Sequence, residues 1–173
     1  MKEMIRKFKW FWAWQDEQEE AWLHSMSQEG LHLIKPGFFG FYEFEQGSPV
    51  NYIYRLDYVY PKKDAQNYYQ IFSDAGWEHL GAMGGWQYFR KEVQPGETPE
   101  IYTDPQSKIE KYNRLMFILI ILNPVYWLVL VISRDNSTNW FFGCLFILYL
   151  GLMLLFVIAF VKLAQRIKEL KEL

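Results

Sequence analysis

Two long runs of uncharged residues near the C-terminus constrain this chain more than any other feature. Residues 115–132 form a run of 18 residues without a charge, and residues 140–161 form a run of 22. At a rise of about 1.5 Å per residue, the shorter run makes a helix of about 27 Å, close to the ~30 Å thickness of a bilayer's hydrocarbon core. Buried helices of soluble proteins have apolar runs of only about 10–14 residues. The two runs therefore predict two transmembrane helices.

The residues around these runs predict the orientation of the helices. Only residues 133–139 separate the runs, so we expect an antiparallel hairpin. Seven Lys or Arg residues lie on the outer sides of the hairpin, whereas the turn contains only Arg134. Positively charged residues stay on the cytoplasmic side, so this asymmetry predicts a two-pass protein of the cell membrane with both termini in the cytoplasm. Neither run contains a charge, and we interpret the hairpin as an anchor in the lipid bilayer rather than an ion pathway.

The rest of the chain is acidic and rich in aromatic residues. Residues 1–106 carry 10 Lys or Arg and 16 Asp or Glu, a net charge of −6, and aromatic residues make up 20% of the sequence. The aromatic content excludes a disordered chain, and the acidic charge argues against nucleic acid as a partner. One cysteine excludes an internal disulfide. No signal-peptide pattern is present, so we expect a compact cytoplasmic domain.

The order of predicted elements repeats within this acidic part. The first unit reads as strand, helix, strand and strand, expected at residues 8–14, from Asp16 to a stop at Gly30, at 31–34 and at 38–44. The second unit reads in the same order, expected at residues 52–58, from Asp64 to a stop at Gly76, at 77–80 and at 86–90. A shift of 46 residues superposes the two glycines and places Trp22 and Met26 on Tyr68 and Phe72. We interpret this agreement as an internal duplication.

The duplication predicts the fold class and the domain organisation. We expect an α+β cytoplasmic domain at residues 1–92, built from repeats of about 7–46 and 51–92, in which an antiparallel sheet carries two helices on one face. Residues 93–106 contain three prolines and are expected to form a linker. The transmembrane hairpin of residues 107–173 follows and ends in a polar cytoplasmic tail.

The strands of both units concentrate aromatic side chains. Alternate residues of a strand share one face, so Trp10, Trp12 and Trp14 are expected to lie together. Such rings form either a core or the wall of a cleft for an apolar, planar or cationic ligand, because ring faces attract cations. Charged strand residues either orient such a ligand or face water. The candidate ligand or partner contacts are Trp10, Trp12, Trp14, Glu43, Tyr54, Arg55, Asp57 and Trp86.

The sequence contains no motif of a catalytic or cofactor site. It lacks the nucleophile elbow of hydrolases, the phosphate-binding loop and the dinucleotide fingerprint. His24 follows Glu20 by four residues, so the two share a helix face, but no third ligand at metal-site spacing accompanies them. We therefore expect no catalytic residues, no cofactor and no metal, and we predict that the protein is not an enzyme.

Six short strings carry a resemblance to a known family. They are FKWFWAW (8–14), EAWL (20–23), YRLDY (54–58), DAGWEH (74–79), GWQYFR (85–90) and SKIEKY (107–112). Over about residues 7–114, the chain resembles a bacterial membrane-protein family with a domain of unknown function, found mostly in Firmicutes and often encoded beside PadR-type transcriptional regulators. The resemblance implies a cytoplasmic domain followed by membrane helices, and no activity. The doubled element order is also similar to effector-binding domains of the gyrase-inhibitor-like type, which bind hydrophobic drugs, as a likeness of fold alone.

Two functions remain open from the sequence. The domain is either an adaptor that holds a cytoplasmic protein, such as a PadR-type regulator, at the membrane, or a membrane-tethered sensor that binds a hydrophobic or cationic amphiphile. A cleft with aromatic walls from both repeats would favour the sensor, and an exposed aromatic patch without a cavity would favour the adaptor. We prefer the adaptor at this point, because it requires only an anchor and a surface. The oligomeric state stays open.

Overall fold

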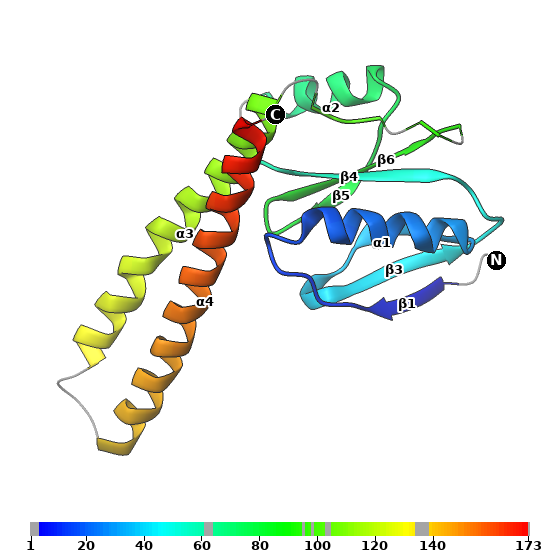
Figure 1. Cartoon of the computed structure of the whole chain (residues 1–173). Coiled ribbons are helices and arrows are strands. Elements are labelled where there is room, and N and C mark those ends of the chain that lie inside the picture. Colours follow the sequence, from blue (N-terminus) through cyan, green and yellow to red (C-terminus); the bar gives the residue numbers. More distant parts are fainter. Residues whose placement is uncertain are drawn as a thin grey trace. The chain divides into compact units, whose positions relative to one another are not determined.

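The structure is a computed structural model of the chain (Figure 1). It describes residues 4–60, 64–94, 96–97, 99–102, 105–133 and 139–172, with the side chains of residues 38, 122–133, 139–142 and 145 left out. The chain divides into two compact units, Met1–Thr103 and Asp104–Leu173. The first unit is a mixed α+β domain and the second is helical.

The described part of the first unit has the predicted order strand, helix, strand, strand, followed by the same order again (Figure 1). The strands are β1 (Met4–Phe8), β2 (Leu31–Pro36), β3 (Phe41–Gln46), β4 (Tyr52–Tyr58), β5 (Glu78–Met83) and β6 (Trp86–Glu92). The helices are α1 (Asp16–Gln28) and α2 (Ala65–Asp74), with a 3-10 turn η1 (Phe38–Gly40) before β3. The duplicated order of elements is confirmed.

Each repeat forms its own antiparallel sheet. The strand order is β1-β3-β2 in the first sheet and β4-β6-β5 in the second, so the last strand of each repeat lies in the middle. Both sheets also carry a bulge at the equivalent place, between Leu33 and Lys35 in β2 and between His79 and Gly81 in β5. These bulges are 46 residues apart, which agrees with the shift that superposes Gly30 on Gly76.

The prediction of one continuous sheet is wrong. β2 and β5 lie beside each other, yet they belong to separate sheets. The ring of Pro36 at the end of β2 lies against Gly81 of β5, where a Cβ would be 3.5 Å from the proline Cδ. Proline has no N–H to donate to a neighbouring strand. This contact therefore packs the two strands without joining them through their backbones.

The first strand ends before most of the residues predicted to form it. β1 pairs with β3 up to the pair Phe8–Phe41, and the N–H of Lys9 then donates to the carbonyl of Gly40 at 2.8 Å. The partner strand begins at Phe41, so residues 9–15 have no edge with which to pair and form a loop. A strand needs such a partner whatever its intrinsic propensity.

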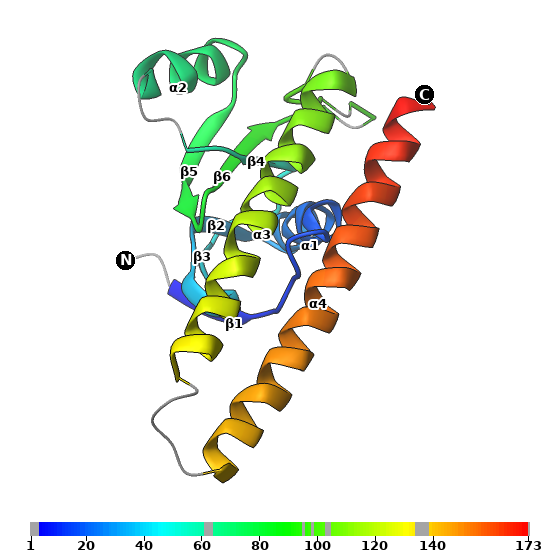
Figure 2. The ribbon, with the colours of Figure 1, turned by 90° about the vertical axis from the view of Figure 1, so that its left-hand side faces the viewer.

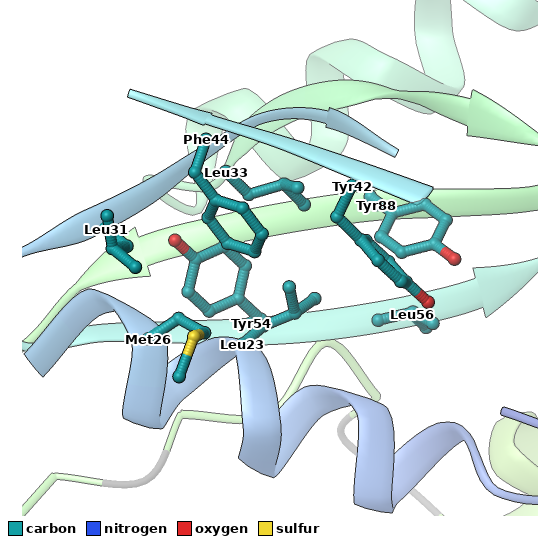
Figure 3. Close-up of a cluster of buried hydrophobic side chains, with 9 residues drawn as sticks. All are labelled: Leu23, Met26, Leu31, Leu33, Tyr42, Phe44, Tyr54, Leu56 and Tyr88. Carbon is teal, nitrogen blue, oxygen red and sulfur yellow. The ribbon is translucent and has the colours of Figure 1, made fainter. Parts of the chain in front are cut away.

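The main core lies between α1 and strands of both repeats (Figure 3). Its buried side chains are Leu23, Met26, Leu31, Leu33, Tyr42, Phe44, Tyr54, Leu56 and Tyr88. Three of these, Tyr54, Leu56 and Tyr88, belong to the second repeat. A smaller cluster in the second repeat contains Ile53, Trp77, Phe89 and Val93, with Tyr68, Tyr69 and Phe72 of α2 packed against it. The first repeat is therefore completed by strands of the second.

Polar side chains of α1 bind the backbone at the edge of β4. Glu20 accepts the N–H of Leu56 through Oε1 at 2.8 Å, and Nδ1 of His24 lies 2.8 Å from the carbonyl oxygen of Tyr52. The hydroxyl of Ser27 donates to the same carbonyl at 3.4 Å. An edge strand exposes backbone groups that need partners, and α1 supplies them here. The shared face of Glu20 and His24 thus serves the fold.

The ends of the helices match the prediction only in part. Gly30 and Gly76 follow α1 and α2 with φ of +81° and +82°, which confirms both as helix stops. The spacing of Asp16 and Glu19 predicts a capping box at the start of α1, and this prediction is wrong, because the N-cap is Gln15 and no side chain caps this end. Glu19 points into the domain instead.

The second unit consists of α3 (Pro105–Ser133) and α4 (Asn139–Lys171), which lie side by side (Figure 2). Among the residues that the structure describes, one stretch is long and apolar enough to cross a membrane, Phe146–Lys171 of α4. The backbone of residues 115–132 is helical within α3, but the side chains from residue 122 on, and the turn at 134–138, lie outside the described residues. The structure thus gives one candidate span, where the sequence predicts two.

Candidate functional site

Two carboxylates of α1 lie buried in the first unit. Asp16 is 3% exposed and Glu19 is 7% exposed, and both belong to the first turn of the helix. Glu19 precedes the buried Leu23 and Met26 by four and seven residues, so it lies on the same helix face as these core side chains. Buried carboxylates are uncommon unless polar groups or charges stabilise them. These two therefore mark the first turn of α1 as a candidate site.

Glu19 is held by tyrosines from both repeats. The hydroxyls of Tyr42 and Tyr88 donate to its Oε1 at 2.8 Å and 2.6 Å. Among the described residues, no tyrosine hydroxyl donates to its other oxygen, Oε2. Burial raises the pKa of Glu19 above its usual 4.5, and the neighbouring charge of Asp16 raises it further, against the lowering effect of the two hydroxyls. A positive charge beside Glu19 would favour the ionised carboxylate and so oppose the effects of burial and of Asp16 on its pKa.

A cavity of about 250 Å³ opens over these carboxylates. Its lining residues are Trp10, Phe11, Trp12, Ala13, Asp16, Glu19, Phe39, Gly40, Tyr42, Met83 and Trp86. Met83 and Trp86 flank the turn between β5 and β6 of the second repeat, whereas the other lining residues belong to the first. We call this cavity the aromatic pocket. It combines ring walls from both repeats with an acidic floor from α1.

The loop of residues 9–15 builds one wall of the aromatic pocket. Its indole rings contact one another in series, Trp10 against Trp12 edge to face at 5.7 Å and Trp12 against Trp14 stacked at 5.3 Å. Gln15 closes the loop, since its N–H donates to the Trp12 carbonyl at 2.8 Å and its Oε1 accepts the Trp12 N–H at 3.0 Å. These contacts fix the tryptophans at the entrance to α1.

Another lining residue, Phe39, has a backbone conformation that side chains rarely adopt. Phe39 has φ of +52° and ψ of +43°, in the left-handed region. A non-glycine residue held there costs free energy, of the order of 1–3 kcal/mol, and such positions concentrate at functional sites. The ring of Phe39 is 66% exposed, so burial of the ring does not repay this cost within the domain. The conformation instead displays the ring at the pocket.

Comparison with known families identifies the chain. The family model described as "Protein of unknown function (DUF2812)" matches residues 15–123. The chain belongs to this family. The match confirms that part of the resemblance seen in the sequence which concerns a domain of unknown function. No curated protein and no solved structure matches the chain.

The DUF2812 region contains the acidic floor of the pocket but only part of its aromatic wall. Asp16, Glu19, Tyr42 and Trp86 lie within residues 15–123, whereas the loop tryptophans Trp10, Trp12 and Trp14 precede it. The carboxylates therefore belong to the region that the family model matches.

Three of the predicted contact residues line the pocket of this DUF2812 protein. They are Trp10, Trp12 and Trp86. Trp14 stacks on Trp12 but is not among the lining residues, and the expected strand face of Trp10, Trp12 and Trp14 is wrong, because they follow one another in a loop. The rings gather through mutual contacts rather than through strand alternation.

The other predicted contact residues lie elsewhere in the domain. Glu43 pairs with Arg6 at 2.8 Å and with Lys35 at 3.2 Å on the outer face of the first sheet. Tyr54 is 1% exposed and belongs to the main core. Neither residue lines the aromatic pocket.

Arg55 and Asp57 connect β4 to the segment before α3. Arg55 pairs with Glu20 at 3.3 Å and with Glu100 at 2.9 Å. Asp57 accepts hydrogen bonds from the hydroxyls of Tyr68 and Tyr102. Residues 100–102, predicted as part of a linker, thus contact β4. These contacts give both charged residues a structural role outside the aromatic pocket.

The carboxylates of the pocket are candidate functional residues that no sequence motif indicates. Glu19 extends the stripe of Leu23 and Met26 by one turn, and this spacing was the available signal for an inward carboxylate. A second signal was the shift of 46 residues, which places Ala65 of α2 opposite Glu19. Among the described residues, no group of three His, Cys, Asp or Glu side chains is arranged to hold a metal ion.

Proposed function

We propose that the first unit is a membrane-tethered sensor that binds the cationic head group of an amphiphile in the aromatic pocket. The observation that carries this proposal is the combination, in one cavity, of two buried carboxylates with ring walls from both repeats. Ring faces attract cations, and buried carboxylates need a positive charge more than exposed ones do. An organic cation uses both the ring walls and the carboxylates, whereas a neutral apolar ligand uses the ring walls alone.

The size of the pocket indicates which part of a ligand enters it. A volume of about 250 Å³ is below the range of about 300–1,000 Å³ that is usual for pockets of drug-sized ligands. A compact head group fits this space and a long apolar chain does not. We therefore propose that the head group enters the pocket while the tail stays outside, beside the exposed rings of Trp10 and Phe39.

The position of the pocket across both repeats supports a sensing role. Trp86 and Met83 of the second repeat and Trp10 and Phe39 of the first contact the same cavity. A ligand that binds both repeats favours the arrangement in which they approach one another. Binding of a ligand in the aromatic pocket would in this way change the conformation of the domain.

The membrane anchor of this proposal is the two-helix hairpin. We propose that residues 115–132 and 140–161 both span the bilayer, with both termini in the cytoplasm. The support is the absence of charge in both runs, the antiparallel pairing of α3 and α4, and the seven cations outside the turn against Arg134 within it.

The adaptor is the second candidate function. Its support is the exposure of several rings around the pocket, which offers a surface to a protein such as a PadR-type regulator. The concave pocket favours the sensor, since an adaptor surface requires no cavity and no buried carboxylates.

The proposal is tested by tryptophan fluorescence of the full chain in lipid nanodiscs. Phenyltrimethylammonium serves as the head-group probe, and tert-butylbenzene, which has the same shape without the charge, serves as the neutral probe. We expect a saturable quench with the cation alone. Glu19→Gln should weaken binding by about tenfold or more, as expected when one charged partner is lost in a buried site.

The matched control is Glu17→Gln, which removes the same charge from an exposed position of the same helix turn. This variant should bind the cation as the natural protein does. Binding should also strengthen as pH rises through the raised pKa of Glu19, because only the ionised carboxylate attracts the probe. Equal affinity for the two probes, or equal loss in the two variants, would refute the cation site.

A further inference from the structure

Five exposed aromatic rings gather at one end of the first sheet. They are Phe8, Trp10, Trp12, Phe39 and Phe41, and they are between 39% and 66% exposed. We call this set the ring patch. The segments that carry the rings are adjoining, because Phe8 pairs with Phe41 and the Lys9 N–H donates to the Gly40 carbonyl. Soluble monomers rarely expose contiguous apolar surface of this kind without a partner.

The geometry of the chain holds these rings outward. Phe8 and Phe41 contact each other at 5.1 Å on the outer face of the sheet, opposite the face that carries the buried Tyr42 and Phe44. Phe39 is displayed by its left-handed backbone, and Trp12 is fixed by Gln15. The exposure is therefore built into strand pairing and loop contacts.

The charge around the ring patch is opposite to that of the domain as a whole. Residues 4–15 contain Arg6, Lys7 and Lys9 and no acidic residue, although residues 1–106 together are acidic. Lys35 of β2 adds a fourth cation, and Glu43, which pairs with Arg6 and Lys35, is the acidic residue between them. The carboxylates of the pocket lie buried behind the rings. Arg6 shares the outer face of Phe8, Lys7 lies on the other face of β1, and the Lys9 ammonium lies over the Phe11 and Trp22 rings. The edge of the sheet beside the rings thus carries more cations than carboxylates.

We infer that the ring patch docks onto the surface of an anionic lipid bilayer. Tryptophan and other amphipathic rings favour the head-group region, and Lys and Arg side chains are attracted to anionic lipids while their aliphatic stems cover apolar surface. The same chain carries a helix able to cross a membrane, Phe146–Lys171, so a bilayer is held near the domain and weak contacts suffice for docking.

Docking places the mouth of the aromatic pocket at the membrane surface. Trp10, Trp12 and Phe39 belong both to the ring patch and to the pocket lining. An amphiphile then reaches the pocket from the bilayer, with its tail remaining among the lipids. This last step rests on the proposed ligand binding, whereas docking itself rests only on the membrane anchor.

The test uses the full chain with Cys144→Ser and a single new cysteine that carries the polarity-sensitive fluorophore NBD. Trp10→Cys places the fluorophore in the ring patch, and Ile71→Cys, at an exposed position of α2, is the matched control. Each protein is placed in nanodiscs of phosphatidylcholine alone or of equal parts phosphatidylcholine and phosphatidylserine. Far-UV circular dichroism checks that each variant is folded.

We expect the fluorophore at position 10 to shift to the blue in the phosphatidylserine discs and to be quenched there by brominated lipid. The shift should be lost with Lys7→Glu and Lys9→Glu together, and the fluorophore at position 71 should respond to neither lipid. A water-like spectrum at position 10 in both discs would overturn the inference. A shift that appears only after cell extract is added would assign the ring patch to a protein partner and overturn it as well.

Loss of docking and loss of ligand binding are separable in this experiment. Glu19→Gln should leave the lipid-dependent shift unchanged, because this carboxylate lies inside the pocket and not on the docking surface. If the shift occurs but phenyltrimethylammonium does not bind, the docking surface stands and the proposed sensor fails.

Discussion

The two repeats of the first unit share a framework but use their helices differently. Both have the same strand order, equivalent bulges and equivalent glycine stops. α1 buries six residues, including Asp16, Glu19 and Glu20, whereas α2 has no buried residue among its described positions. The duplicated part is thus the backbone scaffold. The repeats differ in the helix that each carries.

The largest expected difference between the repeats is in core packing. Leu23→Ala should destabilise the domain by about 3–5 kcal/mol, because Leu23 is 0% exposed and its removal leaves a cavity. The equivalent change in α2, Tyr69→Ala, should cost only about 1–2 kcal/mol, since Tyr69 is partly exposed. Urea unfolding of the full chain in nanodiscs measures both. An equal loss of unfolding free energy in the two variants would show that α1 and α2 contribute equally to core packing, and would contradict the difference described between the repeats.

A smaller difference is expected at the two helix stops. Gly30→Ala and Gly76→Ala each force a side chain into the left-handed region, at a cost of about 1 kcal/mol. A Cβ at position 30 would also lie 2.4 Å from the carbonyl oxygen of Gly47, whereas at position 76 it would meet the end of Lys91 at 3.4 Å. Gly30→Ala should therefore cost about 1–3 kcal/mol more than Gly76→Ala in the same assay. The reverse order would contradict the described packing at these turns.

The smallest expected effect is the pH dependence that Glu19 of the first repeat contributes to stability. The pKa of Glu19 is raised in the folded state, so between 4.5 and that raised pKa the folded protein holds more protons than the unfolded chain. The contribution of Glu19 to stability is then lost as pH rises through this window, with a slope of at most about 1.4 kcal/mol per pH unit. Glu19→Gln should flatten the slope, because the amide does not titrate. The free energy of unfolding of both proteins, measured across this window, tests the assignment; identical slopes would refute it.

The sequence predicts the second repeat better than the first. β4 occupies the predicted residues 52–58, because β-forming residues continue along a strand that has a full-length partner in β6. The helix stripe of Tyr68 and Phe72 packs as expected for the same local reasons. In the first repeat, the propensity of the aromatic string 8–14 predicts a strand, but whether these residues form one depends on where their partner β3 begins. A local sequence pattern reports the β-propensity of its own residues, but not the length of the strand with which they would pair.

The sequence predicts that the candidate site has aromatic walls, but it does not predict all of the residues that line it. The aromatic walls are visible in the sequence as tryptophan density, and Trp10, Trp12 and Trp86 do meet in the pocket. The acidic floor was not predicted, because Glu19 fits a capping box as well as it fits an inward helix face. Tyr42 and Tyr88, which decide between these roles, come from β3 and β6. Such tertiary hydrogen bonds leave no local pattern.

The contact between α1 and the edge of β4 has a consequence for synthesis. Residues 52–58 leave the ribosome only after all of the first repeat has been made, because they follow it in the chain. Until then Glu20 and His24 have water in place of the β4 backbone, and the main core lacks Tyr54 and Leu56. A nascent chain that ends after β3 therefore exposes an unfinished core and is open to chaperones and proteases. Because the two repeats share the main core, the first completes its packing only when the second arrives.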